Sequence, residues 1–270
     1  MIEKTLGFLG YGNMGTAILE GLLDLGVVAA DRVHIYDPSP DRCALAAAVN
    51  VRAATSPEVL ADESDVLLLA VKPQTMDAAL TQIRDNLRPG VVIISIAAGI
   101  TIDFIQTRLG GETRVIRVMP NTPYLAHAGA AGIAVSPQCE DSDRNLAHAL
   151  FASIGIAEDV AESDMDVVTA LSGSGPAYFF RMVECLVEAA VSQGLDRAVA
   201  ERLAGQTLYG AGKLLMESED SAAQLRVKVT SPGGTTAAAL QAFDDGGLAP
   251  LVGNAVQAAV DRGRELGASK

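Results

Sequence analysis

The sequence is poor in positive charge and has no run of basic residues. It carries 20 Lys and Arg against 33 Asp and Glu, a formal net charge of −13 at pH 7. Proteins that bind nucleic acids through phosphates need clustered Lys and Arg. We therefore expect no nucleic-acid partner. An anionic ligand must instead be held locally, and a helix N-terminus supplies such a local positive potential.

Cysteine is scarce, and long apolar runs are missing. The cysteines Cys43, Cys139 and Cys185 lie far apart and lack the spacing of a metal site. We expect buried thiols in a reducing compartment and no metal site. No apolar run approaches the ~20 residues of a membrane span, and the first one stops in a glycine turn, unlike a signal peptide. We expect a cytoplasmic protein without membrane contact.

The first part of the chain alternates short apolar runs with helical patterns. The apolar runs are 6–9, 33–36, 66–71, 91–96 and 115–118, and two more strands, around 130–135 and 156–160, bracket a helix at 141–153. Continuous apolar strands separated by helices are typical of a parallel sheet covered on both faces. The pattern predicts a doubly wound, mostly parallel, Rossmann-like α/β domain over residues 1–161.

From residue 162 onward only helical patterns remain. The predicted helices are 164–171, 176–193, 197–216, 221–228, 235–243 and 248–266. Ala and Gly stand where helix faces would meet, and several faces are too apolar for a solvated monomer. We expect an all-helical dimerisation domain over residues 162–270, giving a homodimer or a higher oligomer built from such dimers.

A glycine-rich turn, GYGNMG, follows the first predicted strand and runs into a helical pattern. Gly10 permits a tight turn, Gly12 lets the backbone reach a pyrophosphate, and Gly15 allows close packing of helix on strand. The second strand ends in Asp37, about twenty residues further on, as the fingerprint of a dinucleotide site requires. The residues expected to bind a dinucleotide here are Gly10, Gly12, Asn13, Met14 and Gly15.

Three other predicted strands end in loops rich in Pro or Gly, which read VKPQ, SIAAG and MPNTP. Each loop, taken alone, is an ordinary strand-ending turn. In an open parallel sheet, however, ligands bind beyond the carboxyl ends of the strands. The residues expected to line the nicotinamide end of a dinucleotide are Val71, Lys72, Pro73, Ala97 and Asn121.

The segment SPGGTT, residues 231–236, precedes an Ala-rich helical pattern. Gly233 and Gly234 allow positive φ and a close backbone approach, and we expect Thr235 and Thr236 to cap the helix. By spacing alone, the segment is an ordinary helix start. Its backbone N–H groups would also suit a small anion.

The helical half contains TALSGSGPAY, residues 169–178. We expect Gly175 and Pro176 to break one helix and start another, and on this pattern alone Ser172 and Ser174 could simply be capping residues. From Ser172 to the end of this segment there is no His and no carboxylate.

The motifs GYGNMG, VKPQ, SIAAG, MPNTP, TALSGSGPAY and SPGGTT, in this order, resemble those of the pyrroline-5-carboxylate reductases over nearly the whole chain. The resemblance implies reduction of the C=N bond of 1-pyrroline-5-carboxylate to L-proline, the last step of proline biosynthesis. A protonated imine is already electrophilic, so orientation against the nicotinamide can dominate the rate. The resemblance places Thr169 near the ring nitrogen. It places the substrate carboxylate, with Val229 packing nearby, on Ser231, Gly233, Gly234, Thr235 and Thr236.

The residues after the second strand point to two cofactors. Asp37 would accept a hydrogen bond from a ribose 2′-hydroxyl and repel a 2′-phosphate. Ser39 and Arg42 follow it and can bind that phosphate. With the resemblance added, we expect NADPH, with NADH as a possible second cofactor.

Two other functions remain open from the residues. A related reductase of 2-keto or 3-hydroxy acids would use a Lys of the second domain, but no Lys lies between Lys72 and Lys213. Lys213 fits an exposed helical position. A nucleotide-sensing protein without catalysis would need only the first domain, and it gives no reason for SPGGTT.

Overall fold

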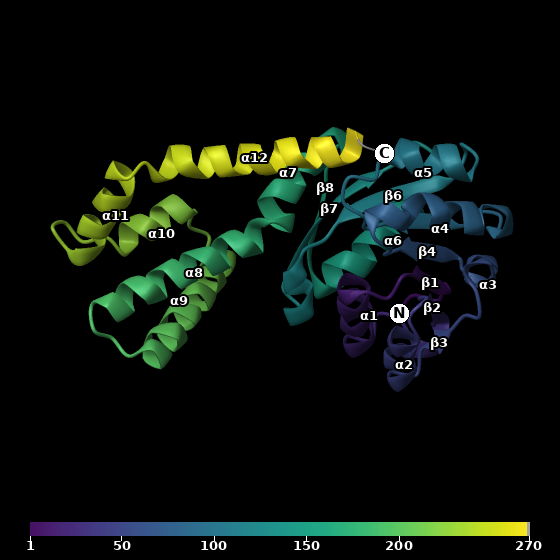
Figure 1. Ribbon diagram of the computed structural model, residues 1–270, viewed down its shortest axis with the longest axis horizontal. Coiled ribbons are helices and arrows are strands. Elements are labelled where there is room, and N and C mark those ends of the chain that lie inside the picture. The colour runs from purple at the N-terminus through teal and green to yellow at the C-terminus, as the bar shows by residue number, and fades with distance from the viewer. Residues whose placement is uncertain (269–270) are drawn as a thin grey trace. The chain divides into compact units, whose positions relative to one another are not determined.

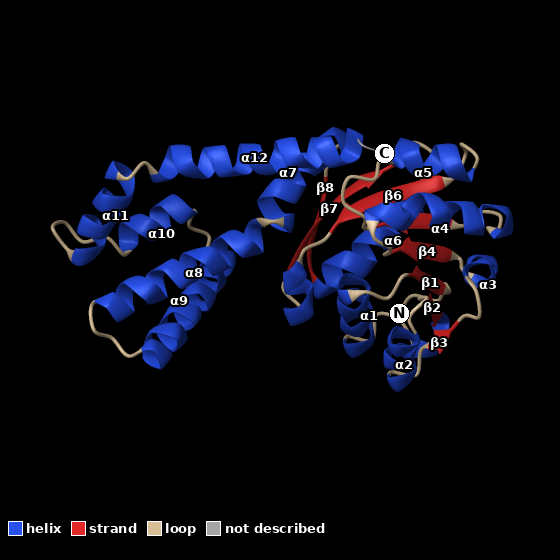
Figure 2. Cartoon of the chain, viewed as in Figure 1, coloured by secondary structure: helices blue, strands red, loops and turns tan. Residues whose placement is uncertain are grey.

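The chain folds into two compact units. The computed structural model describes residues 1–268. The sheet unit comprises Met1–Ser174 together with residues 259–268, and the helical unit comprises Gly175–Ala258. Figure 2 shows the strands in the sheet unit and the helices and loops of the helical unit. The boundary after residue 161 stays a prediction about sequence domains, and the compact units divide after Ser174.

An eight-stranded sheet forms the centre of the sheet unit (Figure 1), in the order β3-β2-β1-β4-β5-β6-β7-β8. Neighbouring strands are parallel, except that β6 and β7 are antiparallel. The strands are β1 (Leu6–Leu9), β2 (Val33–Tyr36), β3 (Arg52–Ala53), β4 (Val66–Leu69), β5 (Val92–Ser95), β6 (Arg114–Met119), β7 (Gly129–Val135) and β8 (Gly155–Asp159). The doubly wound, mostly parallel α/β fold is confirmed.

Helices cover both faces of this sheet. One face carries α1 (Asn13–Asp24), α2 (Pro40–Ala48) and α6 (Asp141–Phe151), and the other carries α3 (Pro57–Glu63), α4 (Met76–Ile83) and α5 (Ile102–Leu109). Several of these helices begin at a residue whose side chain caps the first turn. The Ser56 and Thr101 hydroxyls accept from backbone N–H groups and cap α3 and α5, and Glu140 and Asp143 form a capping box at α6.

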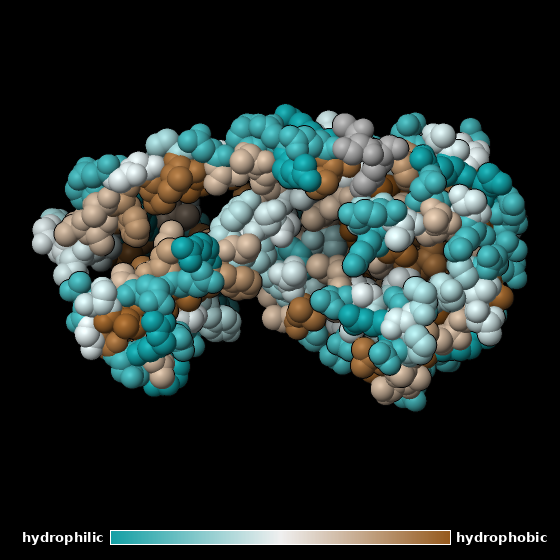
Figure 3. Space-filling model, viewed as in Figure 1, coloured by the Kyte–Doolittle hydropathy of each residue, from teal (hydrophilic) through white to brown (hydrophobic). Residues whose placement is uncertain are grey.

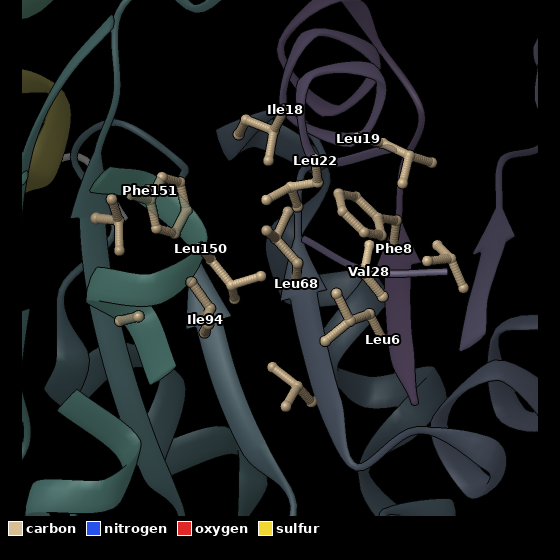
Figure 4. Close-up of a cluster of buried hydrophobic side chains, with 14 of the residues drawn as sticks. Leu6, Phe8, Ile18, Leu19, Leu22, Val28, Leu68, Ile94, Leu150 and Phe151 are labelled. Carbon is tan, nitrogen blue, oxygen red and sulfur yellow. The ribbon is translucent and has the colours of Figure 1, made fainter. Parts of the chain in front are cut away.

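A hydrophobic core lies between the sheet and helices α1 and α6. Figure 4 shows Phe8 of β1 and Leu68 of β4 reaching toward Leu22 of α1, with Phe151 from α6 in the same cluster. Alternate residues of the same strands, such as Leu69, pack in a second core with α3, α4 and α5. Because both faces are buried, the strands are continuously apolar.

The helical unit contains α8 (Gly175–Ser192), α9 (Arg197–Glu217), α10 (Ala222–Lys228), α11 (Thr235–Asp245) and the first part of α12 (Leu248–Ala268), which continues into the sheet unit. Asp196 and Ser221 cap α9 and α10 with their side chains. The predicted helices therefore exist, with ends shifted by a few residues.

A new helix begins at Gly175, as predicted for the break at Gly175 and Pro176. Helix α7 (Met165–Val168) runs into a π-helical turn, Thr169–Gly173, which ends at Ser174, and α8 begins at the next residue. Pro176 is the second residue of α8, in the first turn, where the N–H that proline lacks would have no partner within the helix.

Most side chains of the helical unit are exposed in the single chain. Of residues 175–258, all of which the structure describes, only Gly175, Val187 and Ala200 are buried. Phe179 and Phe180 are each 59% exposed, and Figure 3 shows apolar surface, in brown, on this unit. The expectation of buried thiols is wrong for Cys185, which is exposed on α8, while Cys43 and Cys139 are half-buried. An 84-residue unit with so small a core needs a partner to cover it.

Candidate active site

The glycines of the GYGNMG turn differ in what the fold demands of them. Gly10 has φ of 93°, and a Cβ there would lie 2.9 Å from the carbonyl carbon of Ala70, after β4. A Cβ at Gly15 would lie 3.1 Å from the carbonyl oxygen of Gly10. A Cβ at Gly12 would meet nothing within 4 Å. The packing explains Gly10 and Gly15, and it leaves Gly12 as an open backbone surface.

Helix α1 begins at this open surface. Gly12 is its N-cap residue, and no side chain caps the first turn. The first N–H groups of a helix have no partner within the helix, and together with the helix dipole they attract anions. The turn lies between the carboxyl ends of β1 and β4, where the strand order reverses. This geometry fits the pyrophosphate of a dinucleotide.

The loop after β2 is joined to the glycine turn. The Asp37 carboxylate accepts from the backbone N–H of Tyr11 at 2.8 Å and from that of Ser39 at 2.9 Å. Arg42 donates to the Asn13 side-chain oxygen at 3.0 Å. Burial raises the pKa of Tyr11, with Glu20 adding to the rise, and the Arg42 charge opposes it. Arg42 therefore lies close to the glycine turn.

The other predicted strand-end residues follow the carboxyl ends of β4, β5 and β6, which are neighbours in the sheet. Lys72 is exposed and precedes the 3₁₀ turn Pro73–Thr75, and Val71 is half-buried. Ala97 is buried beside Ser95. The structure thus brings these three loops to the same sheet edge as the glycine turn.

Asn121 is 8% exposed and its side chain bridges two elements. Its amide nitrogen donates to the Ser172 carbonyl at 3.1 Å, and its oxygen accepts from the N–H of Ala130 at 2.9 Å. Asn121 therefore ties the end of β6 to β7 and to the π-helical turn. Whether it also contacts a cofactor stays a prediction.

Thr169 begins the π-helical turn. Its hydroxyl donates to the Met165 carbonyl at 2.7 Å, and the N–H of Ser174 closes the turn by donating to the Thr169 carbonyl at 2.8 Å. The hydroxyl of Ser172 likewise donates to the Val168 carbonyl. Ser172 therefore lies within the turn and does not cap it, whereas Ser174 is the residue that caps its end. Because the Thr169 hydrogen is already donated, its oxygen offers lone pairs to a ligand.

The SPGGTT segment lies in the helical unit and forms a tight turn before α11. The N–H of Gly234 donates to the Ser231 carbonyl at 3.0 Å, and Gly233 has φ of 69°. Thr235 and Thr236 do not cap α11, since the helix begins at Thr235 and Gly234 is its N-cap residue. Within the described residues, the hydroxyls of Ser231, Thr235 and Thr236 have no hydrogen-bond partner, so this helix start offers free donors.

The described residues hold no group of three or more His, Cys, Asp or Glu side chains placed to bind a metal ion. Over the same residues, no helix combines the length and the apolar composition that crossing a membrane requires.

Two family models match the chain. Residues 5–99 match "NADP oxidoreductase coenzyme F420-dependent", and residues 162–266 match "Pyrroline-5-carboxylate reductase dimerisation". A pyrroline-5-carboxylate reductase of Methanosarcina acetivorans is 38% identical over 99% of this chain and 99% of its own length. The chain belongs to the pyrroline-5-carboxylate reductase family. The resemblance read from the ordered motifs is confirmed.

Solved structures of this family have the same fold. A pyrroline-5-carboxylate reductase from Coxiella burnetii superposes with a TM-score of 0.94 at 36% identity, covering 98% of this chain and 99% of that one. A pyrroline carboxylate reductase from Plasmodium falciparum, solved with NADP bound, superposes with a TM-score of 0.89 at 32% identity, covering 99% of each chain. The superposition covers nearly the whole of each chain, so the α/β sheet and the helical region occur together in this family.

Two contacts of the site were not predicted from the sequence: the bond from the Tyr11 backbone to Asp37, and the bridge that the Asn121 side chain makes between two elements. The Tyr11 side chain is fully buried in the core below α1, while its backbone N–H bonds to Asp37. Both features depend on contacts between residues far apart in the sequence, so no local pattern signals them. The Asn in MPNTP was the one available signal for the Asn121 bridge, since a buried side-chain amide needs hydrogen-bond partners on both its oxygen and its nitrogen.

Proposed function

We propose that the protein catalyses the reduction of 1-pyrroline-5-carboxylate to L-proline with NADPH as the hydride donor. The observation that carries this proposal is the match to the family from end to end, with both the glycine turn and SPGGTT inside it. The open surface at Gly12 supports the dinucleotide, and the free donors at the start of α11 support an anionic substrate. NADH is a second, weaker cofactor in this proposal.

NADPH, when bound, supplies a hydride to the imine carbon. We assign its pyrophosphate to the start of α1, with Gly10, Gly12, Asn13, Met14 and Gly15, and its 2′-phosphate to Ser39 and Arg42 beside Asp37. The residues assigned to the nicotinamide end are Val71, Lys72, Pro73, Ala97 and Asn121. These assignments are supported by the common sheet edge on which the strands end.

The substrate carboxylate is assigned to the N-terminus of α11. Free N–H groups, the hydroxyls of Ser231, Thr235 and Thr236, and the helix dipole all favour an anion there. Each hydrogen bond to a charged group contributes about 1.5–3 kcal/mol. Two or three such bonds would supply most of the binding free energy of a small imino acid. Gly233 and Gly234 let the backbone approach the ligand, and Val229, which is exposed, packs nearby.

Thr169 is assigned to the ring nitrogen. Its hydroxyl hydrogen is held by the Met165 carbonyl, so its oxygen can accept a hydrogen bond from the N–H of a protonated imine. When the hydride adds to the imine carbon, the C=N π pair becomes the nitrogen lone pair and the N–H proton stays in place. Thr169 then orients the ring and need not act as an acid. This suits a hydroxyl, which is a poor acid at neutral pH.

The apolar surface of the helical unit supports a homodimer, and dimers can associate further through the same kind of surface. We further propose that the protein is cytoplasmic, because the reducing cytoplasm contains NADPH and keeps thiols free. The net charge of −13 argues against a nucleic-acid partner.

Turnover tests this function. Oxidation of NADPH is followed with 1-pyrroline-5-carboxylate and, in parallel, with a panel of 2-keto acids. We expect rapid oxidation with the cyclic imine alone. Faster oxidation with a keto acid would replace the proposal by the related reductase function, and tight NADPH binding without turnover of any substrate would favour a nucleotide sensor.

A further inference from the structure

We propose that Asp37 is a positioning residue that braces the glycine turn against the loop after β2, and that it does not choose between NADPH and NADH. Arg42, with the free hydroxyl of Ser39, makes that choice. The inference rests on the proposed dinucleotide-dependent function. It departs from the simple expectation that an acidic residue at the end of the second strand reads the ribose 2′-hydroxyl.

The Asp37 carboxylate is already engaged on both oxygens. One oxygen accepts from the N–H of Tyr11 at 2.8 Å, and the other accepts from the N–H of Ser39 at 2.9 Å. The Cys43 thiol also donates to the Asp37 backbone carbonyl at 3.3 Å. The two N–H groups belong to different loops, so the carboxylate links the start of α1 to the start of α2.

This bonding fixes the direction of the carboxylate and offsets its charge. Hydrogen bonds between N–H donors and an ionised acceptor are short and roughly twice as strong as neutral ones. An Asp that rejects NADPH must present an uncompensated negative charge to the 2′ position. At Asp37, two N–H dipoles point at that charge, and the Arg42 guanidinium lies near the same turn.

The Arg42 side chain still has N–H donors available to bind a phosphate. A guanidinium has five N–H donors, and within the described residues Arg42 uses its side chain in one bond, to the Asn13 oxygen at 3.0 Å. The Ser39 hydroxyl has no partner in the same part of the chain. Ser39 and Arg42 both follow β2, on the segment that Asp37 ties to the glycine turn. The hydrogen bonds of Asp37 therefore determine the positions of these two residues.

The experiment measures dissociation constants by calorimetry for NADPH, NADH, 2′,5′-ADP and 5′-ADP. Asp37→Asn keeps one acceptor oxygen and loses the other, and Asp37→Ala loses both. Asp41→Asn is the matched control, because Asp41 is exposed on α2 and has no partner within the described residues. Arg42→Gln removes the charge that is proposed to bind the 2′-phosphate.

We expect Asp37→Asn to weaken NADPH and NADH about equally, by about tenfold each, and Asp37→Ala to weaken both further. The kcat at saturating NADPH and the KM for the imine should stay unchanged, and amide exchange at Tyr11 and Ser39 should speed up. Asp41→Asn should change nothing. Arg42→Gln should weaken NADPH and 2′,5′-ADP tenfold or more and NADH and 5′-ADP less than twofold.

A shift of the NADPH to NADH affinity ratio by tenfold in Asp37→Asn, absent from Asp41→Asn, would overturn the inference, because it would show direct repulsion. Unchanged affinities in both Asp37 variants would overturn it as well. Thermal unfolding of each variant shows whether it is folded. If Asp37→Ala does not fold, the test rests on Asp37→Asn, whose side chain is close in size to that of Asp. The readouts need no substrate, so a wild-type protein that binds dinucleotides but reduces no imine would refute the proposed function alone.

Discussion

Gly10 and Gly12 stand two residues apart in one turn, and only Gly10 is required by the packing. A Cβ at Gly10 would lie 2.9 Å from the Ala70 carbonyl, whereas a Cβ at Gly12 would meet nothing within 4 Å. The fold alone would accept a side chain at Gly12. Under the proposed function, a ligand that approaches the backbone would explain its absence there, as for the middle glycine of a dinucleotide site.

Gly12→Val tests this difference directly. Gly12 has φ of −77° and ψ of −174°, an extended conformation that valine adopts readily. We expect a loss of about 1 kcal/mol or less in folding stability, from a poorer N-cap residue, and a loss of NADPH affinity of tenfold or more. Gly10→Ala should instead destabilise the fold, because it adds a clash to a left-handed conformation. A folded Gly12→Val variant that binds NADPH like the wild type would place the cofactor elsewhere.

Thr236→Val tests the anion site at α11. The change keeps the shape and removes a hydroxyl that is free in the structure, so the KM for the imine should rise about tenfold while the Kd for NADPH stays constant. Proline, which shares the carboxylate, should lose affinity in parallel as a competitive ligand. Thr81→Val is the control, since the Thr81 hydroxyl on α4 is already donated to the Asp77 carbonyl. An unchanged KM would reduce SPGGTT to a helix start.

Gly234→Ala is a poorer test of the same site. A Cβ at Gly234 would lie 2.4 Å from the Ser231 hydroxyl oxygen and 3.2 Å from the Ser231 carbonyl. The substitution should therefore shift the turn itself. We expect its KM to rise as well, with a lowered Tm that Thr236→Val does not show.

Thr169→Val should lower kcat by tenfold or more, because the ring N–H loses its acceptor, and should leave the Kd for NADPH unchanged. Thr169→Ser keeps the hydroxyl and should recover most of the rate. Steady-state kinetics at saturating NADPH give both values. Equal kcat in the valine and serine variants would remove the hydroxyl from the account and leave Thr169 as a part of the π-helical turn.

The helical unit should associate through its exposed aromatic residues. Phe180 is 59% exposed on α8 in the single chain, so Phe180→Glu should raise the dissociation constant of the dimer, with free monomer appearing at micromolar concentration in sedimentation. Leu45→Glu is the matched control, since Leu45 is 51% exposed on α2 of the sheet unit. A wild-type protein that sediments as an active monomer at micromolar concentration would contradict the dimer.

The strands of this fold could be predicted because they are buried on both faces. Runs such as Val66–Leu69 are apolar without interruption, and that pattern is visible in a single sequence. Strand β3, Arg52–Ala53, was missed because only two residues pair with β2 and neither is buried. The residues after β1, β4, β5 and β6 were placed correctly on one edge, since parallel strands carry their ends together.

The local geometry of the site was less predictable. The Gly and Pro of TALSGSGP predicted the helix start at Gly175, but the π-helical turn at Thr169 before it has no signal in the pattern. Thr235 and Thr236 have the composition of capping residues, but the tight turn at Gly234 places them inside α11. The two backbone partners of Asp37, at Tyr11 and Ser39, were not predicted either. Each difference arises from contacts that a one-dimensional pattern does not contain.

Transfer of an isotope tests the central claim most directly. The enzyme is supplied with 1-pyrroline-5-carboxylate and NADPH that carries deuterium at both hydrogen positions of the reactive nicotinamide carbon. The account predicts L-proline with one deuterium on the former imine carbon, formed by the wild type and much more slowly by Thr169→Val. Proline without deuterium, or no proline while deuterium enters another product, would contradict direct hydride transfer to the cyclic imine.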